Sequence, residues 1–349
     1  MTDTTRLTDE VPSDTAADAA GLMDLILGLV RVQVLHGVVA LHIPDHVADG
    51  ARTAEEVAKR EGTQPRATYR LMRAAASLGV LSYEGERRFG LTGRGELLRA
   101  DVPGSLRSFV LVQAGHPQWQ IMGLLPVAVR QGTSQADEAL GAGIFDYLSR
   151  PENAGQAALF AESMVDLSNM TVAGAVAAVD IAGASTVVDV GGADGQFVLE
   201  LMAANPGLRG QVLDLPHAVE GARQEAGKRG LSERFSAVAG DFFTTVPTAD
   251  LYLLKTVLHD WDDDRAVAIL RNCRSAAPDG GRALVVETVI GEIGKPDFAV
   301  LSDMGMLCVT GGIERDLGEF DTLFAASGWR RGKTYPVGGG YYGMELDAV

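Results

Sequence analysis

Cysteine is almost absent from this chain, which contains only Cys273 and Cys308 among its 349 residues. Both stand in apolar or helical surroundings, so we expect buried, reduced thiols rather than a disulfide framework or a cysteine metal site. The same scarcity favours a cytoplasmic location, because proteins of oxidising compartments use more paired cysteines.

Positive charge is also in short supply. The chain has 30 Lys and Arg residues against 46 Asp and Glu residues, which gives a formal net charge of −16 at pH 7. A field of this sign repels polyanions. The composition therefore argues against nucleic acids and anionic membranes as partners, and it favours neutral or cationic small molecules.

The sequence has no evident targeting segment and no long apolar run. Residues 1–20 are acidic and lack a basic stretch followed by an apolar one, so we interpret them as a disordered tail rather than a signal or transit peptide. The longest apolar run, IMGLLPVAV at 121–129, is interrupted by Pro126 and is far shorter than the roughly 18 residues that cross a bilayer. We therefore expect no membrane-spanning segment.

Residues 21–102 predict a small, mostly helical domain with one hairpin. Apolar residues recur at helical spacing over 22–40, Thr53 is placed to cap a second helix, and Pro65 begins a third. The segment VLSYEGERRFGLT then predicts two short strands. Three helices followed by a hairpin are typical of a winged helix.

A winged helix can read DNA, and Arg66, Arg70 and Arg73 share one face of the candidate recognition helix. The alternative is a packing or dimerisation module, because the first helix is apolar nearly all round. The net charge of −16 favours the second interpretation.

Residues 103–180 carry helical patterns with aromatic and Met side chains among small residues. Most of these side chains suit a core, and some suit the wall of a flat, apolar ligand pocket, because aromatic rings and Met pack well against planar rings. The candidates for acceptor contacts, in this segment and in the later segment 303–309, are Trp119, Phe145, Phe160, Met164, Asp303, Met304 and Leu307.

Residues 181–349 alternate short apolar strands with helices. The predicted strands are TVVDV (186–190), QVLDL (211–215), FSAVAG (235–240), ADLYLLK (249–255) and RALVVETV (282–289). This alternation predicts a doubly wound, Rossmann-like α/β sheet, in which ligands bind at the carboxyl ends of the strands.

The first of these strands runs directly into the glycine-rich turn Gly191-Gly192-Ala193-Asp194-Gly195. Glycines in such a turn let the backbone approach a ligand closely. They do not have the spacing of a dinucleotide fingerprint, and no Gly-Lys-Ser/Thr of a phosphate-binding loop follows. The turn therefore predicts a cofactor loop and disfavours NAD.

Acidic residues close successive strands. Asp214 ends the second strand, where a carboxylate can accept both hydrogens of a ribose diol. Asp241 follows the third strand, where it can accept from an adenine amine while Phe242 covers a ring face. Each acid alone could equally cap a helix, but with Asp189 in the first strand the series favours a cofactor site.

The fourth strand ends in LLKTVLHDWDDDRAVAIL (253–270), and here the chain closely resembles a known family. It resembles the S-adenosylmethionine-dependent O-methyltransferases of the plant caffeic-acid type and their bacterial antibiotic-pathway relatives, over roughly residues 22–345. The resemblance rests on VVDVGGADG, VLDLPHAV, GDFF, LLKTVLHDWDDD, VVETVI and GGIERDLGEF. The family loop usually has glycine where this chain has Ala193.

This resemblance implies a fold, a cofactor and an assembly. The fold is a Rossmann-like class I methyltransferase sheet at 181–349, with a winged-helix dimerisation domain at 21–102 and a helical acceptor segment at 103–180. The implied cofactor is S-adenosylmethionine, with S-adenosylhomocysteine as product and no metal. The implied partners are a small aromatic substrate and a second copy of the chain.

By position, the resemblance also implies site residues. His259 would be the general base, supported by Glu287 and Glu314. The residues implied at the cofactor are Asp189, Gly191, Gly192, Asp214, Leu215, Gly240, Asp241, Phe242, Phe243, Lys255 and Trp261.

We expect methyl transfer to a phenolic hydroxyl of a small aromatic secondary metabolite. A phenol of pKa about 10 is ionised only about one part in a thousand at pH 7, so a nearby imidazole base assists its attack. An aromatic amine is the alternative acceptor, because its neutral nitrogen already offers a lone pair. Other chemistry on the same fold, and a DNA-binding regulator that senses the cofactor, are further alternatives.

Overall fold

The structure, a computed structural model, describes residues 13–349 and divides the chain after Gly115 into two compact units. The first helix begins at Ser13, so residues 13–20 are helical and the expected disordered tail is too long. Residues 1–12 lie outside the described part of the chain. The first unit also takes in residues 103–115, which the sequence pattern groups with the acceptor segment.

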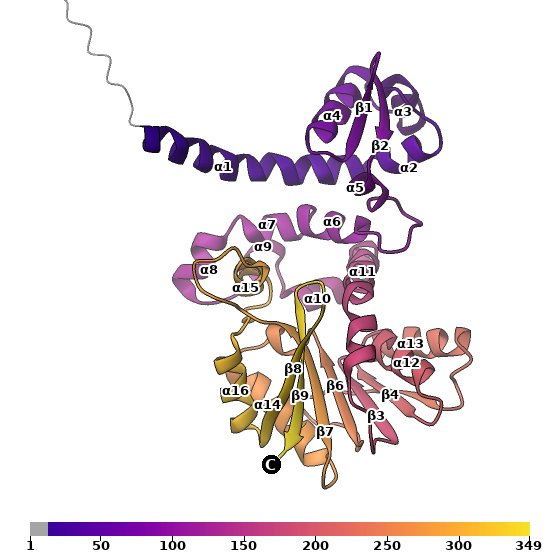
Figure 1. Cartoon of the computed structure of the whole chain (residues 1–349), viewed down its shortest axis with the longest axis vertical. Coiled ribbons are helices and arrows are strands. Elements are labelled where there is room, and N and C mark those ends of the chain that lie inside the picture. The colour runs from indigo at the N-terminus through magenta and orange to yellow at the C-terminus, as the bar shows by residue number, and fades with distance from the viewer. Residues whose placement is uncertain (1–12) are drawn as a thin grey trace, which may run out of the picture. The chain divides into compact units, whose positions relative to one another are not determined.

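The first unit consists of helices and one antiparallel hairpin, as predicted (Figure 1). Its elements are α1 (Ser13–Ala40), α2 (Ile43–Ala48), α3 (Ala54–Glu61), α4 (Pro65–Ser77), β1 (Leu81–Gly85), β2 (Arg88–Leu91), α5 (Gly93–Glu96) and α6 (Arg107–Ala114). Local signals set the helix starts, because Thr53 and Glu56 form a reciprocal capping box and Pro65 is the first residue of α4. Buried side chains from Val38 of α1 to Phe89 of β2 form its core.

The amino-terminal half of α1 has a row of exposed apolar side chains. Leu22, Leu25, Ile26 and Leu29 are each more than half exposed. By length and composition, Thr15–Ala40 is the one helix among the described residues that could cross a membrane. This corrects the expectation that no segment is long enough: isolated charges interrupt the apolar runs without changing the apolar character of the whole helix. The same composition suits a helix that another protein chain covers.

The arginines of α4 lie on an exposed face, as their spacing predicts. Arg66, Arg70 and Arg73 line a groove together with Arg87 of the hairpin turn, and Arg87 lies over the Tyr69 ring at 4.0 Å. This part of the chain therefore has a basic surface despite the acidic composition of the whole. The expectation that the protein binds no nucleic acid stays a prediction.

The second unit has a seven-stranded sheet in the order β5-β4-β3-β6-β7-β9-β8. The strands are β3 (Thr186–Val190), β4 (Arg209–Asp214), β5 (Phe235–Ala239), β6 (Leu251–Lys255), β7 (Arg282–Thr288), β8 (Trp329–Gly338) and β9 (Tyr341–Ala348). The five predicted strands, β3 to β7, are parallel. The strands β8 and β9 add an antiparallel edge that the sequence analysis missed, because their mixed polar composition has no continuous apolar run.

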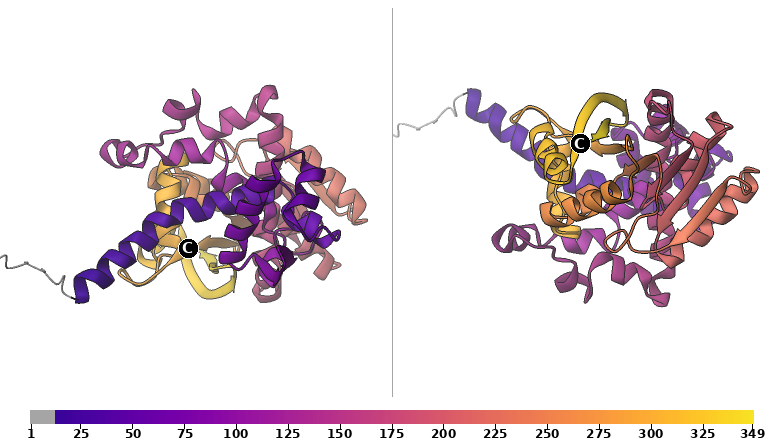
Figure 2. Two further views of the ribbon diagram at one scale, coloured as in Figure 1. Left: turned by 90° about the horizontal axis from the view of Figure 1, so that it is seen from above. Right: turned by 90° about the horizontal axis from the view of Figure 1, so that it is seen from below.

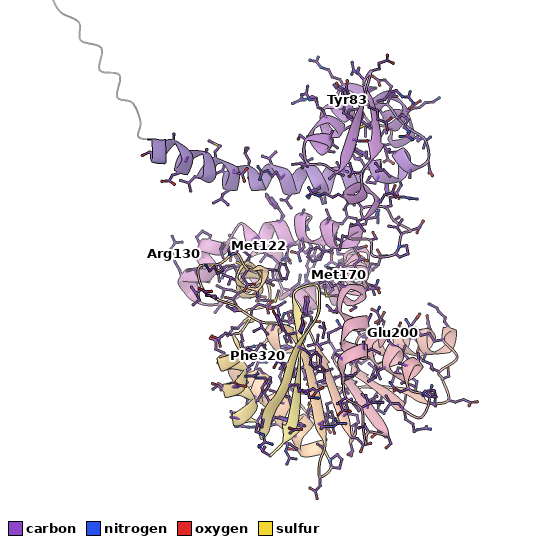
Figure 3. All side chains as sticks on the ribbon, viewed as in Figure 1. Tyr83, Met122, Arg130, Met170, Glu200 and Phe320 are labelled. Atoms are coloured by element: carbon purple, nitrogen blue, oxygen red, sulfur yellow. The ribbon has the colours of Figure 1, made fainter. Side chains whose placement is uncertain are left out.

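Helices cover both faces of this sheet (Figures 1 and 2). The helices on one face are α11 (Ala154–Ala178), α12 (Gln196–Ala204) and α13 (Pro216–Lys228), and those on the other are α14 (Asp263–Ala276) and α16 (Leu317–Ala326). Neighbouring strand residues enter opposite cores, since Val187 packs with the first group and Val188 with the second. Phe320 of α16 belongs to the second core (Figure 3). The strand order reverses beside β3, which is where such sheets bind ligands.

The short helices of the acceptor segment lie in the same part of the second unit as α15 (Phe298–Val309), which contacts the first two of them (Figure 1). They are α7 (Gln118–Met122), α8 (Leu125–Gln131), α9 (Ala136–Leu140) and α10 (Ile144–Ser149), followed by the turn η1 (Pro151–Asn153). Ile121, Ile144 and Cys308 are buried in one cluster, against which Met122 packs (Figure 3). Cys308 and Cys273 are both buried and free, as predicted.

Candidate active site

The glycine-rich turn after β3 has the tight backbone that its sequence predicts. Gly191 has a φ of 70°, and a Cβ built on it would lie 3.0 Å from Val257 Cγ2. A Cβ on Gly192 would lie 2.5 Å from Asp189 Cγ, so the buried Asp189 carboxylate fills the space beneath the turn. A side chain at either glycine would collide with these residues, so the tight backbone of the turn depends on glycine at both positions, as a cofactor loop requires.

Ala193 takes a left-handed conformation in the same turn, with a φ of 49°. A Cβ strains the backbone there, which gives a physical reason for the glycine that the family usually has at this position. The Ala193 amide donates to Asp214 Oδ2 at 2.8 Å and so joins the turn to the end of β4.

Asp214 and Asp241 lie at strand ends, as predicted, and backbone amides orient both carboxylates. Asp214 Oδ1 accepts from the Leu215 amide at 2.6 Å, and Asp241 Oδ1 accepts from the Phe243 amide at 2.8 Å. A carboxylate has about four lone-pair sites, so each retains capacity for a ligand. Leu215 itself is 48% exposed, and a Cβ on Gly240 would lie 2.9 Å from a buried leucine, so this glycine permits close strand packing.

Three aromatic rings come together from two strand ends. The ring centroids of Phe242, Phe243 and Trp261 are 4.9 to 6.1 Å apart in edge-to-face pairs. The Arg265 guanidinium lies 4.4 Å from the Phe243 ring centre and 4.2 Å from that of Trp261. Ring surfaces of this kind suit a flat, apolar ligand face. The grouping agrees with the predicted adenine site, and the contact with adenine stays a prediction.

Opposite charges lie on the neighbouring strands β3 and β6. Burial raises the pKa of Asp189 to about 7, and the Lys255 ammonium opposes this rise. Burial lowers the pKa of Lys255, and the negative charges of Asp189 and Glu287 oppose that change. Lys255 therefore lies among the acids of the strand ends, and its contact with a cofactor stays a prediction.

Two buried carboxylates lie beside one ring nitrogen of His259. It belongs to the short turn η2 (Leu258–Asp260) after β6. Its Nδ1 is 3.2 Å from Glu314 Oε1 and 3.6 Å from Glu287 Oε2. In the neutral ring, two carboxylates beside Nδ1 favour a proton on that nitrogen, which leaves the lone pair on Nε2. The structure thus brings together the three residues that the sequence predicts as catalytic.

Glu287 shapes the turn that carries His259. It is fully buried at the end of β7, and its Oε1 accepts from the amides of Val257 at 2.9 Å and Leu258 at 2.8 Å. Among the described residues, its Oε2 has no hydrogen-bond partner. One oxygen therefore fixes the backbone, while the other presents a charge toward the imidazole.

Glu314 is held by residues that the sequence analysis did not identify. Thr288 Oγ1 donates to its Oε2 at 2.5 Å, and Ser302 Oγ donates to its Oε1 at 2.8 Å. The Glu314 amide donates to Asp303 Oδ1 at 2.9 Å, so Asp303 positions the segment that carries Glu314. In the sequence, Ser302 and Asp303 are adjacent polar residues in an otherwise apolar segment, and this pattern could have indicated a polar contact there.

The charges of the site oppose one another. Burial alone would lower the pKa of His259, but the carboxylates of Glu287, Glu314 and Asp260 outweigh it and raise that pKa to about 10. Burial raises the pKa of Glu287 and of Asp260. Burial also acts to raise the pKa of Glu314, but the hydrogen bonds from His259 and its neighbours outweigh it and lower that pKa. Negative charge is thus concentrated around one imidazole that can carry a proton.

The same three side chains could in principle ligate a cation. Ligand atoms of His259, Glu287 and Glu314 lie within 4.8 Å of one another. Hydrogen bonds already hold Glu287 Oε1 to the backbone and Glu314 Oε1 to His259 and Ser302, so this grouping does not require an ion. The metal-free site therefore stays a prediction. Of the acids that follow His259, Asp262 caps α14, since its Oδ1 accepts from the Arg265 amide at 2.9 Å.

The predicted acceptor contacts divide into two groups. Met304 and Leu307 lie on α15, half-buried, and Leu307 packs against the cluster formed with the short helices. Trp119 of α7 and Phe145 of α10 are 41% and 43% exposed, and Phe160 and Met164 lie half-buried on α11. Contact of these residues with an acceptor stays a prediction.

Comparison with known families matches most of the chain. Residues 23–101 match an O-methyltransferase dimerisation domain, and residues 123–330 match an O-methyltransferase domain. The two matches bear out the resemblance of the sequence motifs.

Characterised relatives include both O- and N-methyltransferases. A phenazine O-methyltransferase of Lysobacter antibioticus is 34% identical over 91% of this chain and 93% of its own length. An 8-amino-8-demethylriboflavin N,N-dimethyltransferase of Streptomyces davaonensis is 32% identical over 94% of both chains.

Solved structures with the same architecture extend this comparison. A mitomycin 7-O-methyltransferase has a TM-score of 0.88 and 33% identity, over 97% of this chain and 99% of that one. An O-methyltransferase from neocarzinostatin biosynthesis, in complex with S-adenosylmethionine and 2-hydroxy-5-methyl naphthoic acid, has a TM-score of 0.79 and 33% identity, over 91% and 96% of the two chains.

Proposed function

Because this chain belongs to the O-methyltransferase family that carries an N-terminal dimerisation domain, we propose that it methylates a phenolic hydroxyl of a small aromatic metabolite with His259 as general base. The chain is an S-adenosylmethionine-dependent methyltransferase, and most of the named relatives favour oxygen as the acceptor atom. The observation that carries the base assignment is the pair of buried carboxylates beside His259 Nδ1, at 3.2 and 3.6 Å.

The cofactor site would be formed by the chain's own strand ends. The glycine turn at Gly191 and Gly192 would hold the methionine part, Asp214 the ribose, and Asp241 with the aromatic rings the adenine. When bound, the cofactor supplies an electrophilic methyl group on a cationic sulfur and leaves as S-adenosylhomocysteine. The acidic strand ends are suited to a cationic ligand.

His259 would accept the proton of the acceptor hydroxyl at Nε2 as the oxygen attacks. Glu314 and Glu287 stabilise the resulting imidazolium and keep Nδ1 protonated, so only Nε2 exchanges the proton. A phenol has a pKa of about 10. The neutral imidazole acts as the base, and the carboxylates that raise the pKa of His259 stabilise the imidazolium formed when Nε2 accepts the phenol proton. The chain's other contribution is alignment of the two reactants.

The test is His259→Ala, assayed with labelled methyl donor against a panel of phenols and anilines by mass spectrometry. We expect turnover of phenols to fall by about 100-fold or more, the usual contribution of a general base. Calorimetry should give unchanged affinity for S-adenosylhomocysteine, which serves as the folding control. Near-parental turnover of phenols would exclude His259 as the base.

An amine acceptor is the second candidate, favoured by the relative that is named an N,N-dimethyltransferase. A neutral aromatic amine has a free lone pair before attack, so its methylation depends less on a base. Methylated anilines, formed at similar rates by the parent and by His259→Ala, would identify nitrogen as the acceptor.

We further propose a cytoplasmic homodimer assembled through the first unit. The dimerisation-domain match and the exposed leucines of α1 support this arrangement, because covering such a row removes apolar surface from water. Light scattering should give twice the chain mass without detergent. A monomer in solution, or sedimentation with membranes, would contradict the proposal.

A further inference from the structure

Arg315 is a buried arginine whose five N–H groups all have acceptors. The side chain is 1% exposed. Its Nε and Nη2 donate to Asp263 Oδ1 at 3.0 and 2.8 Å, and Nη2 also donates to the Trp261 carbonyl at 2.8 Å. Its Nη1 donates to the carbonyls of Leu258 and Ile313, both at 3.1 Å. A guanidinium has five donors in a fixed plane, so this set uses all of them.

The acceptors lie on both segments that form the His259 site. The carbonyls of Leu258 and Trp261 belong to the segment that carries the base, and the carbonyl of Ile313 directly precedes the base's carboxylate partner. Arg315 therefore joins the segment of the base to the segment of Glu314.

The two segments are also in direct backbone contact. The Ile313 amide donates to the His259 carbonyl at 2.8 Å, and a Cβ on Gly312 would overlap the same oxygen. The Arg315 carbonyl accepts from the Ile290 amide at 3.0 Å, which anchors this segment beyond β7. The glycine permits the approach, and the guanidinium fixes it.

An ion pair alone does not account for this burial. The carboxylate partner, Asp263, is 69% exposed, and the desolvation of a buried charge offsets much of what such a pair contributes. Three of the five hydrogen bonds go to backbone carbonyls, which would lose their donors if the guanidinium were removed.

We propose that Arg315 is a positioning residue for methyl transfer, which holds His259 in register with Glu314 and, through the Trp261 carbonyl, orients the aromatic wall of the cofactor site. The inference rests on the proposed role of His259. According to this inference, Arg315 affects both the orientation of the base His259 and the binding of the cofactor. The charged groups that face the imidazole are Glu287, Glu314 and Asp260, and Arg315 acts through the backbone rather than on the ring.

The test is Arg315→Lys, which keeps the charge but has three donors at one point instead of a planar fork. We expect kcat to fall by about 10- to 100-fold, the effect of a displacement near 1 Å. The acceptor KM should change less than kcat. Calorimetry should give a several-fold weaker affinity for S-adenosylhomocysteine, and NMR should give a lower pKa of His259 as its contact with Glu314 loosens.

Arg234 offers a matched control on the amino-terminal side of the sheet. Its guanidinium donates to the carbonyls of Met202, Asn205 and Leu208, away from the strand ends that carry the site. Arg234→Lys should lower the melting temperature without changing kcat, cofactor affinity or the pKa of His259. This variant separates a general loss of carbonyl contacts from a loss of positioning.

A cooperative melting curve should first show that Arg315→Lys is folded. The proposal is overturned if this variant then changes kcat, cofactor affinity and the His259 pKa no more than Arg234→Lys does. Failure of the proposed function is a separate result. Full turnover by His259→Ala would show that His259 is not the general base. The S-adenosylhomocysteine affinity of Arg315→Lys and its NMR titration of His259 would still test whether Arg315 positions the site.

Discussion

The two ends of one sheet hold their carboxylates in opposite ways. At the amino ends of β3 and β6, Asp250 accepts four hydrogen bonds of 2.8 to 2.9 Å from the amides and hydroxyls of Ser185 and Thr186. These bonds lower the pKa of Asp250 to about 2. At the carboxyl ends, Glu287 is fully buried with one oxygen unpartnered, and burial raises its pKa.

The difference separates stabilisation from chemistry within one fold. A carboxylate that accepts four hydrogen bonds stabilises the native state, because its charged form is better solvated there than its protonated form. A buried carboxylate with an unpartnered oxygen lowers the stability of the native state. Its negative charge can stabilise a neighbouring imidazole when that ring accepts a proton. Exchanging charge for a neutral amide should therefore have opposite consequences at the two ends.

The largest expected effect is at Glu287. Glu287→Gln keeps an oxygen for the amides of Val257 and Leu258 but removes the charge beside His259 Nδ1. We expect kcat to fall by about 100-fold, because the imidazolium loses a stabilising charge. The free energy of unfolding should stay within about 1 kcal/mol of the parent value, because the desolvated charge is also removed. A large loss of stability with unchanged kcat would contradict the comparison.

Asp250 should respond in the opposite sense. Asp250→Asn should lower the free energy of unfolding at pH 7 by about 1.5 to 3 kcal/mol, the contribution of hydrogen bonds to a charged group, and leave kcat unchanged. The pKa of Asp250 is lowered in the fold, so the parent's advantage is present above the ordinary value near 3.8 and is lost as the pH falls toward about 2. Urea unfolding of the parent and the variant at several pH values measures the stability difference and its pH dependence. A difference that does not change with pH would argue against the Asp250 charge as its cause.

The smallest effect concerns the glycine turn. Ala193→Gly should raise the free energy of unfolding by about 0.5 to 1 kcal/mol, because a φ of 49° strains an L-residue. The matched control is Ala67→Gly in α4, an exposed helical position where glycine should lower stability by a similar amount. Thermal melts of the two variants should move in opposite directions. A destabilised Ala193→Gly would mean that the methyl group packs against the turn.

Local sequence signals carried much of the fold. The capping residues, Pro65 at the start of α4 and the five parallel strands follow from hydrogen bonds and apolar patterns within a few residues, which a sequence displays directly. The strands β8 and β9 were missed because an antiparallel edge alternates its polarity and leaves no apolar run. The length of the apolar helix α1 was underestimated for a different reason, since its few charges interrupt the short runs but leave the helix apolar over Thr15–Ala40.

The site shows the same division. Motif resemblance identified His259, Glu287 and Glu314, and the structure brings them together. The resemblance did not identify roles for Ser302 or Arg315, because these roles depend on which segments meet in the fold.

By itself the sequence determined the element pattern, the glycine turn and the acids at the strand ends, because these depend on neighbours along the chain. Only the tertiary structure decided which oxygen of Glu287 stays unpartnered, which hydroxyls hold Glu314 and where the Arg315 guanidinium donates. Those features need contacts between segments far apart in sequence, and their energies follow from burial and distance rather than from residue type.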